Sequence, residues 1–175
     1  GVKTFGTSSI MLGDTTTGTI DAANNNVGLG VDVFAALTSG DNNVAVGYAA
    51  LGSNTTGIEN VAVGANALDA NTTGNSNIAI GEDALGVQTG GTYNVAVGKL
   101  SQSSITTGNS NVAVGYNTLG SNVAGDRNTA VGMQALQSMS SATTADTYNT
   151  AFGHAAGLNV TTGTGNTLIG SLAGD

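Results

Sequence analysis

The chain has 175 residues and contains 28 glycines but no cysteine, proline or tryptophan. Only 8 % of its residues are charged, against about 25 % in a typical soluble domain, and its formal net charge is −8 with three basic residues. The lack of cysteine excludes disulfide frameworks and cysteine–zinc sites, and the acidic balance argues against binding to nucleic acid or anionic membranes. The hydrophobic fraction of 39 % argues against disorder, and no apolar run approaches the roughly 18 residues of a membrane span.

A five-residue block of the form Asn-Val-Ala-Val-Gly recurs along the whole chain. Its Asn stands at positions 26, 43, 60, 77, 94, 111, 128, 149 and 166, and an earlier copy opens at Ser9, so that ten copies end at glycines from Gly13 to Gly170. A period of 17 residues is too short for helical repeats, which need about 33. The sequence therefore predicts an all-β fold, a parallel β-roll or β-solenoid of about ten 17-residue coils. Residues 1–175 form one repetitive segment, which we expect to belong to a longer chain.

Each block predicts a short strand whose side chains alternate between two faces. One face is large and apolar, the other is mostly alanine, and both avoid charge, which is typical of a strand buried on both sides. We expect the alanines to face the roll interior, closed by leucines from a second strand of each coil. These predicted interior residues are Ala45, Ala62, Ala79, Ala96, Ala113, Ala130, Leu51, Leu68, Leu85, Leu119 and Leu136.

The opposite face forms an outward apolar stripe along the rod. It contains Val44, Val46, Val61, Val63, Ile78, Ile80, Val95, Val97, Val112, Val114, Val131, Phe152 and Ile169. Left exposed, it would exceed the few hundred Å² that a monomer normally shows, and burying each such side chain contributes roughly 1.5–3 kcal/mol. The stripe therefore predicts association into a cyclic oligomer. The asparagines that recur in each block are expected to form hydrogen-bonded ladders along the rod. The recurring block glycines are expected to form corners with positive φ.

Residues with catalytic or metal-binding chemistry are sparse. The only histidine, His154, stands where other copies place side chains as different as Tyr48, Glu82 and Lys99, which indicates an exposed corner. The acidic residues do not form the fixed-step column of calcium-binding rolls, and the single adjacent pair, Glu82-Asp83, fits a solvated corner. No Gly-Lys-Ser/Thr motif marks a phosphate loop. We therefore predict no enzymatic activity, no cofactor and no metal site.

Two features are candidates for recognition. The interval from Asn128 to Asn149 is 21 residues long, which indicates a four-residue insertion. Loops that bulge from solenoids often carry binding. This candidate recognition loop is centred on Ser138, Met139, Ser140, Ser141 and Ala142. The second feature is a set of tyrosines that we expect to be exposed and able to contact carbohydrate or protein, namely Tyr48, Tyr93, Tyr116 and Tyr148.

The repeat unit from Asn43 to Leu51 resembles the head repeats of trimeric autotransporter adhesins of the YadA type, and Asn77–Gly81 is close to their Ser/Asn-Val-Ala-Ile-Gly pentad. Similar repeats occur in phage tail fibres. The resemblance covers the chain from Ser9 to Gly174 and implies a left-handed parallel roll, in which three chains pack around one axis within an adhesive or receptor-reaching fibre. The coils of this chain are longer and more regular than those of the family, with an added Leu-x-x-Asn-Thr-Thr-Gly arm.

On these grounds we expect a non-enzymatic structural or adhesive segment of a homotrimeric extracellular fibre, on a cell surface or a virion, which meets a surface receptor or glycan. Nucleic acid and membrane insertion are not expected. Two alternatives stay open. One is an ice-binding solenoid with a threonine array, because Thr55-Thr56, Thr72-Thr73, Thr106-Thr107 and Thr161-Thr162 recur in phase. The other is a filament subunit that stacks end to end, because neither end of the repeat shows the polar cap of a solenoid.

Overall fold

The structure, a computed structural model, describes residues 2–5, 9–13, 23–143 and 145–175. Within these ranges the chain is all-β and forms no helix, and therefore offers no apolar helix of membrane-spanning length. One sheet contains β1 (Val2–Phe5), β2 (Ser9–Gly13), β3 (Val27–Gly30), β4 (Val44–Val46), β5 (Val61–Val63), β6 (Ile78–Ile80), β7 (Val95–Val97), β8 (Val112–Val114), β10 (Thr129–Val131), β12 (Thr150–Phe152) and β13 (Thr167–Ile169). A second, two-stranded sheet pairs β9 (Gly125–Asp126) with β11 (Ala145–Asp146).

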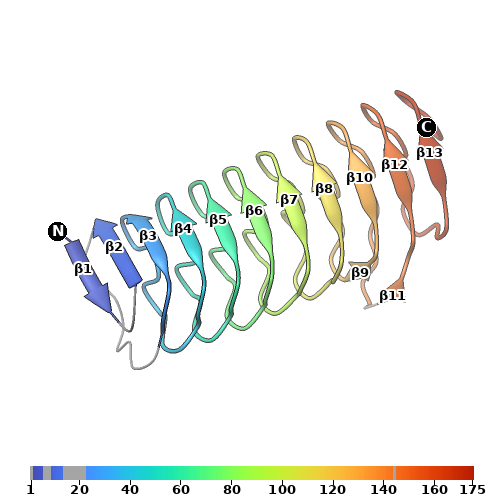
Figure 1. The fold of residues 1–175 in the computed structure, drawn as a ribbon. Coiled ribbons are helices and arrows are strands. Elements are labelled where there is room, and N and C mark those ends of the chain that lie inside the picture. The colour runs from blue at the N-terminus through green and yellow to red at the C-terminus, as the bar shows by residue number, and fades with distance from the viewer. Residues whose placement is uncertain (1, 6–8, 14–22, 144) are drawn as a thin grey trace.

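The predicted parallel β-solenoid is confirmed. From β2 to β13 every strand of the large sheet pairs in parallel with its neighbour, and equivalent residues of the repeat lie side by side, such as Val61 against Ile78 and Ala62 against Ala79. Eight turns join the nine strands from β3 to β13, and each turn advances the chain by one strand spacing along a straight rod (Figure 1). The ten parallel strands are the ten copies of the block that the sequence shows.

The first strand differs from the predicted arrangement. β1 runs antiparallel to β2, with Val2 opposite Leu12 and Phe5 opposite Ser9. A parallel partner requires a whole coil between the strands, whereas only residues 6–8 separate β1 from β2. A short connection of this kind permits only the antiparallel pairing.

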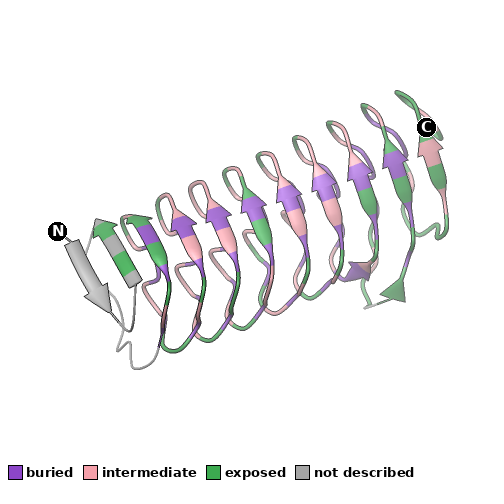
Figure 2. Ribbon diagram, in the orientation of Figure 1, coloured by how far each residue is buried: buried purple, intermediate pink, exposed green. Residues whose placement is uncertain are grey.

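The interior of the rod is narrow and filled by small residues on one wall and leucines on the other. The block alanines from Ala45 to Ala151 are buried in each coil, and the leucines predicted to face them, Leu51, Leu68, Leu85, Leu119 and Leu136, are fully buried. Along β3 to β8, β10 and β12 a buried second residue lies beside more exposed neighbours (Figure 2). A 17-residue coil has room for little more than one leucine and two alanines, which is why alanine recurs on the inward face.

The prediction of a second strand in each coil is wrong. The leucine-bearing segments are turns, and residues such as Ala49 and Leu51 have φ values of 52° and 51°, in the left-handed region. Their amide groups still bond between coils: Ala49 donates to Val31 of the preceding coil, whereas Leu51 donates to Ala67 of the following one. Because the amides bond alternately to the preceding and the following coil, the backbone hydrogen-bonding groups of the turns find partners without a continuous strand. The left-handed residues also let the chain turn sharply enough to close a 17-residue coil.

Candidate functional site

The apolar stripe lies on the outer face of the large sheet. In this single chain, Ile80 is 40 % exposed, Phe152 58 % and Ile169 73 %, while the valines of β4, β5, β7 and β8 are half-buried by their neighbours on adjacent strands. With parallel strands about 4.8 Å apart, nine steps make the stripe about 43 Å long. No charged residue occurs in the outward positions of these strands. The stripe is therefore a straight, uncharged and partly solvent-exposed surface.

The composition of the stripe changes towards the C-terminal end. In β2 to β8 the first outward residue is Ile or Val, but in β10, β12 and β13 it is a threonine, namely Thr129, Thr150 or Thr167. The second outward residue stays apolar there, as Val131 in β10, Phe152 in β12 and Ile169 in β13. The continuous apolar part of the stripe thus runs along β2 to β8, and the last three strands present hydroxyl groups beside apolar side chains.

A buried asparagine ladder runs beside the strands. In each coil the block Asn donates its backbone amide to the Oδ1 atom of the Asn one coil before, as Asn60 does to Asn43 at 2.9 Å. In most coils, with Asn128 an exception, its Nδ2 atom donates to a turn glycine of the next coil, for example from Asn60 to the Gly74 carbonyl at 2.9 Å. The block asparagines from Asn26 to Asn149 are fully buried. The ladder predicted from the sequence is present and holds the corner of each coil to its neighbours on both sides.

A second set of asparagines lies at the same corner and bonds the same turn glycines. Asn54 and Asn71 are buried, and each Oδ1 atom accepts the amide of a glycine three residues later at 3.1 Å. The following threonine donates its hydroxyl to the carbonyl of its counterpart in the next coil, as Thr55 does to Thr72 at 2.9 Å. The Asn-Thr-Thr-Gly arm is therefore a structural corner, and the hydroxyls of Thr55, Thr72 and Thr106 are bonded to backbone carbonyls.

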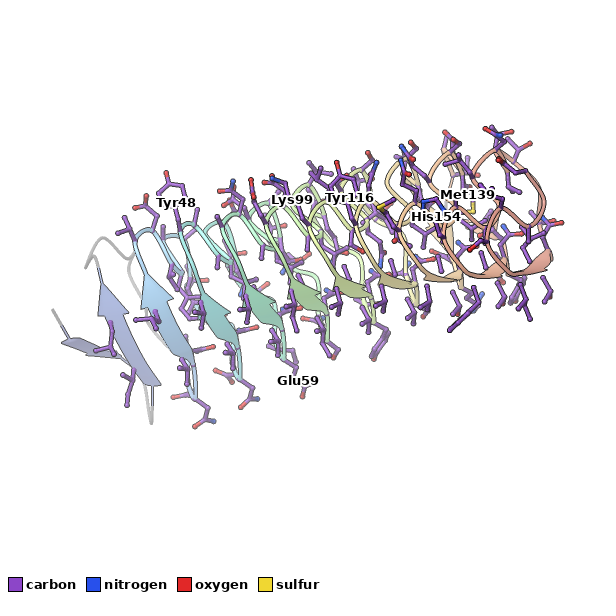
Figure 3. The ribbon with its side chains drawn as sticks, turned by 90° about the horizontal axis from the view of Figure 1, so that it is seen from above. Tyr48, Glu59, Lys99, Tyr116, Met139 and His154 are labelled. Carbon is purple, nitrogen blue, oxygen red and sulfur yellow. The ribbon has the colours of Figure 1, made fainter. Side chains whose placement is uncertain are left out.

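The tyrosines occupy two different edges of the rod. Tyr48 and Tyr116 follow the block glycine, whereas Tyr93 and Tyr148 precede the block asparagine, and all four are exposed. The side chains of Tyr48, Lys99, Tyr116 and His154 point to one side of the rod, and Glu59, which shares its place in the repeat with Tyr93, points to the other (Figure 3). The expected exposure of the four tyrosines is confirmed, but they do not form one cluster.

The side chains of Lys99 and Arg127 each form an ion pair. Lys99 forms an ion pair with Glu82 at 2.8 Å, and this hydrogen-bonded carboxylate raises the pKa of Lys99. Arg127 forms an ion pair with Asp146 of β11, and its guanidinium lies 5.7 Å from the ring centre of Tyr148. Both pairs link neighbouring coils at the surface and contribute little to stability.

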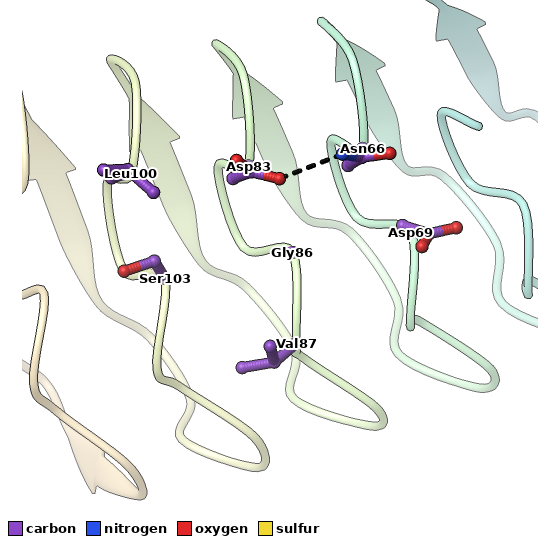
Figure 4. Close-up of a pocket in the computed structure, with 7 residues that line it drawn as sticks. All are labelled: Asn66, Asp69, Asp83, Gly86, Val87, Leu100 and Ser103. Atoms are coloured by element: carbon purple, nitrogen blue, oxygen red, sulfur yellow. Dashed lines mark hydrogen bonds between the residues drawn. The ribbon is translucent and has the colours of Figure 1, made fainter. Parts of the chain in front are cut away.

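A shallow pocket of about 380 Å³ spans three coils on the turn side of the rod (Figure 4). Asn66, Asp69 and Asp83 line its acidic end, where the Nδ2 atom of Asn66 donates to Asp83 at 3.1 Å, and Val87 and Leu100 line its apolar end. Burial, and to a smaller extent the charge of Asp83, raise the pKa of the Asp69 carboxyl. Ser103 also lines the pocket, and the two carboxylates of the pocket are not part of any group of three or more His, Asp or Glu side chains, among the described residues, that could hold a metal ion.

The inserted loop lies later in the chain than the sequence predicted. Ser140 and Ser141 keep the regular stacking, since the amide of Ala124 still donates to Ser141 at 2.9 Å, so the four extra residues fall between Ser141 and Asn149. Met139 is only 1 % exposed, and the Nδ2 atom of Asn149 donates to its sulfur at 3.3 Å. Met139 therefore belongs to the core, in the column of Asn122, and the side chains available for recognition begin at Ser140.

The inserted residues are held in place by two additional contacts. β11 pairs with β9 of the preceding coil, and the hydroxyl of Thr147 donates to the Asp126 carbonyl at 2.9 Å and to the Asn128 side chain at 2.8 Å. A second pocket of about 380 Å³ lies between this loop and the turn of residues 161–164 in the next coil. Sequence reasoning found the insertion from the 21-residue interval, but no signal in the chain indicated this pocket.

The remaining chemistry of the chain is limited. Across the described ranges no group of three or more His, Asp or Glu side chains gathers in a way that could hold a metal ion. His154 is exposed at its corner.

Comparison of the chain with models of protein families, with curated proteins and with solved structures finds no match. The likeness to YadA-type and tail-fibre repeats thus rests on the sequence motif, and the trimer that it implies stays a prediction.

Proposed function

We propose that this chain is a non-enzymatic structural segment of an extracellular fibre, in which three copies pack their apolar stripes against one another. The observation that carries the proposal is the stripe itself. It is uncharged over ten strands, partly exposed in the single chain, and bordered by polar corners. Most monomers do not expose a continuous apolar surface of this length.

A second copy of the same chain is the partner that fits this surface best. The stripe is straight and has a repeat of about 4.8 Å, so a partner that covers its whole length must be equally long and equally regular. Closed, symmetric association of identical chains satisfies this requirement, and it buries the same stripe on every copy. The number three, the adhesive role and the position on a cell surface or virion come from the resemblance to YadA-type and tail-fibre repeats.

Light scattering coupled to gel filtration tests the proposal. The wild-type chain should elute with three times the 16.9-kDa chain mass, about 51 kDa. A double variant, Val61→Asp with Val95→Asp, places charges in the stripe on β5 and β7 and should shift the mass to that of one chain. The matched control, Thr56→Asp with Thr107→Asp, places the same charges on exposed corners and should keep the wild-type mass. A wild-type chain that stays monomeric at millimolar concentration contradicts the proposal.

The ice-binding alternative has weaker support. In five successive coils, from Thr38 to Thr106, the first threonine of the pair donates its hydroxyl to a backbone carbonyl. The exposed hydroxyls are those of the second threonine, and Gly90 interrupts that column. One broken column of hydroxyls does not make the flat array that this alternative requires. A measurement of thermal hysteresis in a cooled sample decides it, and we expect none.

A further inference from the structure

The departures from the repeat gather at one place in the rod. The four extra residues, β11 and the second pocket all belong to the coil of residues 132–149 and the turn that follows it, and β11 adds a pairing with β9 of the preceding coil. The walls of this pocket are residues 140–143 on one side and residues 161–164 on the other, with Met139 between them. Its volume of about 380 Å³ falls in the range of small-molecule sites. Elsewhere in the described chain the same corner is closed by regular stacking.

The lining of the pocket is neutral and rich in hydroxyl groups. No charged side chain is among its residues, which are mainly serine, threonine and alanine. The hydroxyls of Ser141 and Thr147 already donate to protein acceptors. Those of Ser140, Thr161 and Thr162, which also line the pocket, have no side-chain hydrogen bond to any described residue. The pocket therefore has unused hydrogen-bonding groups on both walls.

The apolar groups of the pocket complete a mixed surface. The methyl groups of the exposed Ala142 and Ala145 line it beside the hydroxyls, and the buried Met139 lies at its base. A ligand that fits must present hydroxyl groups and C–H surfaces close together and must carry no charge, because the pocket offers no counter-charge and burial of an unpaired ion is costly. The chain's net charge of −8 also repels anions. Sugars that lack a carboxylate have these properties.

We propose that this pocket binds a neutral saccharide of one or two rings. The ring hydroxyls exchange hydrogen bonds with Ser140, Thr161 and Thr162, and a C–H face of the ring packs on the exposed Ala142 and Ala145. The pocket is open to solvent, so a single site binds weakly. The proposal concerns residues away from the apolar stripe, and it does not depend on the number of copies in the fibre.

A glycan array that contains neutral and sialylated oligosaccharides, probed with the labelled full-length chain, tests the proposal. We expect signal on neutral structures only. The strongest neutral oligosaccharide is then titrated by NMR against the wild type and two variants. Thr162→Trp fills the pocket and should weaken binding at least tenfold. Thr73→Trp, at the same place in the repeat on a regular coil, should bind within twofold of the wild type.

Several results overturn the proposal. These are the absence of binding to any neutral structure, binding to sialylated structures alone, and equal affinities of wild type and Thr162→Trp. Thr162→Val removes only the hydroxyl and should weaken binding by a smaller factor, so it remains informative if the tryptophan variant does not fold. Light scattering of the same samples reports the fibre assembly separately. Absence of saccharide binding in a sample with the trimer mass contradicts the saccharide proposal alone. A monomeric mass in a sample that still binds saccharide contradicts the proposed trimer alone.

Discussion

Replacing Asn94 by alanine should destabilise the fold more than any other single change in the asparagine ladder. The Nδ2 atom of Asn94 donates to the Gly108 carbonyl at 2.7 Å and to Oε1 of Gln88 at 3.0 Å. Its Oδ1 atom accepts the backbone amide of Asn111 at 3.0 Å. In three other coils a second asparagine (Asn54, Asn71 or Asn122) shares the glycine carbonyl, but here that place is held by Ile105. The carbonyl of Gly108 therefore depends on Asn94.

The size of the effect follows from the groups left without a partner. Asn94→Ala deprives the Gly108 carbonyl, the Gln88 Oε1 atom and the Asn111 amide of their hydrogen-bond partners among the described residues, and all three residues are buried. A buried polar group without a partner costs about 1–3 kcal/mol. The free energy of unfolding should therefore fall by roughly 3–9 kcal/mol, a large share of the 5–15 kcal/mol of a typical domain.

Asn166→Ala is the matched control, at the last position of the ladder. Asn166 gives both its amide and its Nδ2 atom to Oδ1 of Asn149, and no described residue donates to its own Oδ1 atom. The hydrogen bond from the backbone amide of residue 166 to Asn149 survives the substitution. The free energy of unfolding should therefore fall by only about 0.5–1.5 kcal/mol. Urea unfolding followed by circular dichroism, at one protein concentration for all variants, gives both values. If Asn94→Ala costs no more than Asn166→Ala, the ladder does not hold the coils together.

Three further substitutions test separate parts of the account. Gly81→Ala should lower Tm more than Gly170→Ala. Both glycines have φ above 110°, but only at Gly81 would a Cβ atom lie 2.6 Å from the backbone of the next coil. Equal shifts in Tm would show that crowding against that backbone is unimportant. Met139→Ala should lower the free energy of unfolding in urea by about 2–5 kcal/mol, as expected for a core residue. A change under about 0.5 kcal/mol would contradict the core position of Met139. The raised pKa of Asp69 means that its ionisation opposes folding, so Asp69→Asn should raise Tm at pH 7. That gain should shrink as the pH falls through the raised pKa and vanish below the ordinary value of 3.8; a gain that is constant with pH would exclude this cause.

The sequence predicted the fold well because each place in the repeat is sampled many times in one chain. The regular return of valine, alanine and glycine determined the strand, its inward face and its register, and comparison between copies stood in for comparison between proteins. The Asn column was interpreted as a ladder for the same reason. The sequence predicted that other chains pack on the stripe because the stripe is apolar. In the single chain the stripe is uncovered.

The features that sequence reasoning missed depend on backbone conformation or on one copy only. Leucine has no preference for positive φ, so nothing in the pattern indicated that Leu51 and its counterparts lie in left-handed turns; packing against the next coil imposes that conformation. The insertion was placed too early because the interval between two asparagines gives its length and not its position. Met139 resembles a loop residue in sequence, yet it continues the column of Asn122 inside the rod.

The most direct test of the central claim, that copies of this chain cover the apolar stripe, uses the absence of cysteine from the chain. A single Ile80→Cys variant carries its only thiol in the stripe, at a side chain that is 40 % exposed in one chain, and Thr73→Cys carries it on an exposed corner. The rate of maleimide labelling is measured for both variants in buffer and in urea. Covered stripes predict that Cys at position 80 reacts at least tenfold more slowly than Cys at position 73 in buffer, and equally fast in urea. Equal rates in buffer would show that the stripe is open to solvent and would contradict the claim.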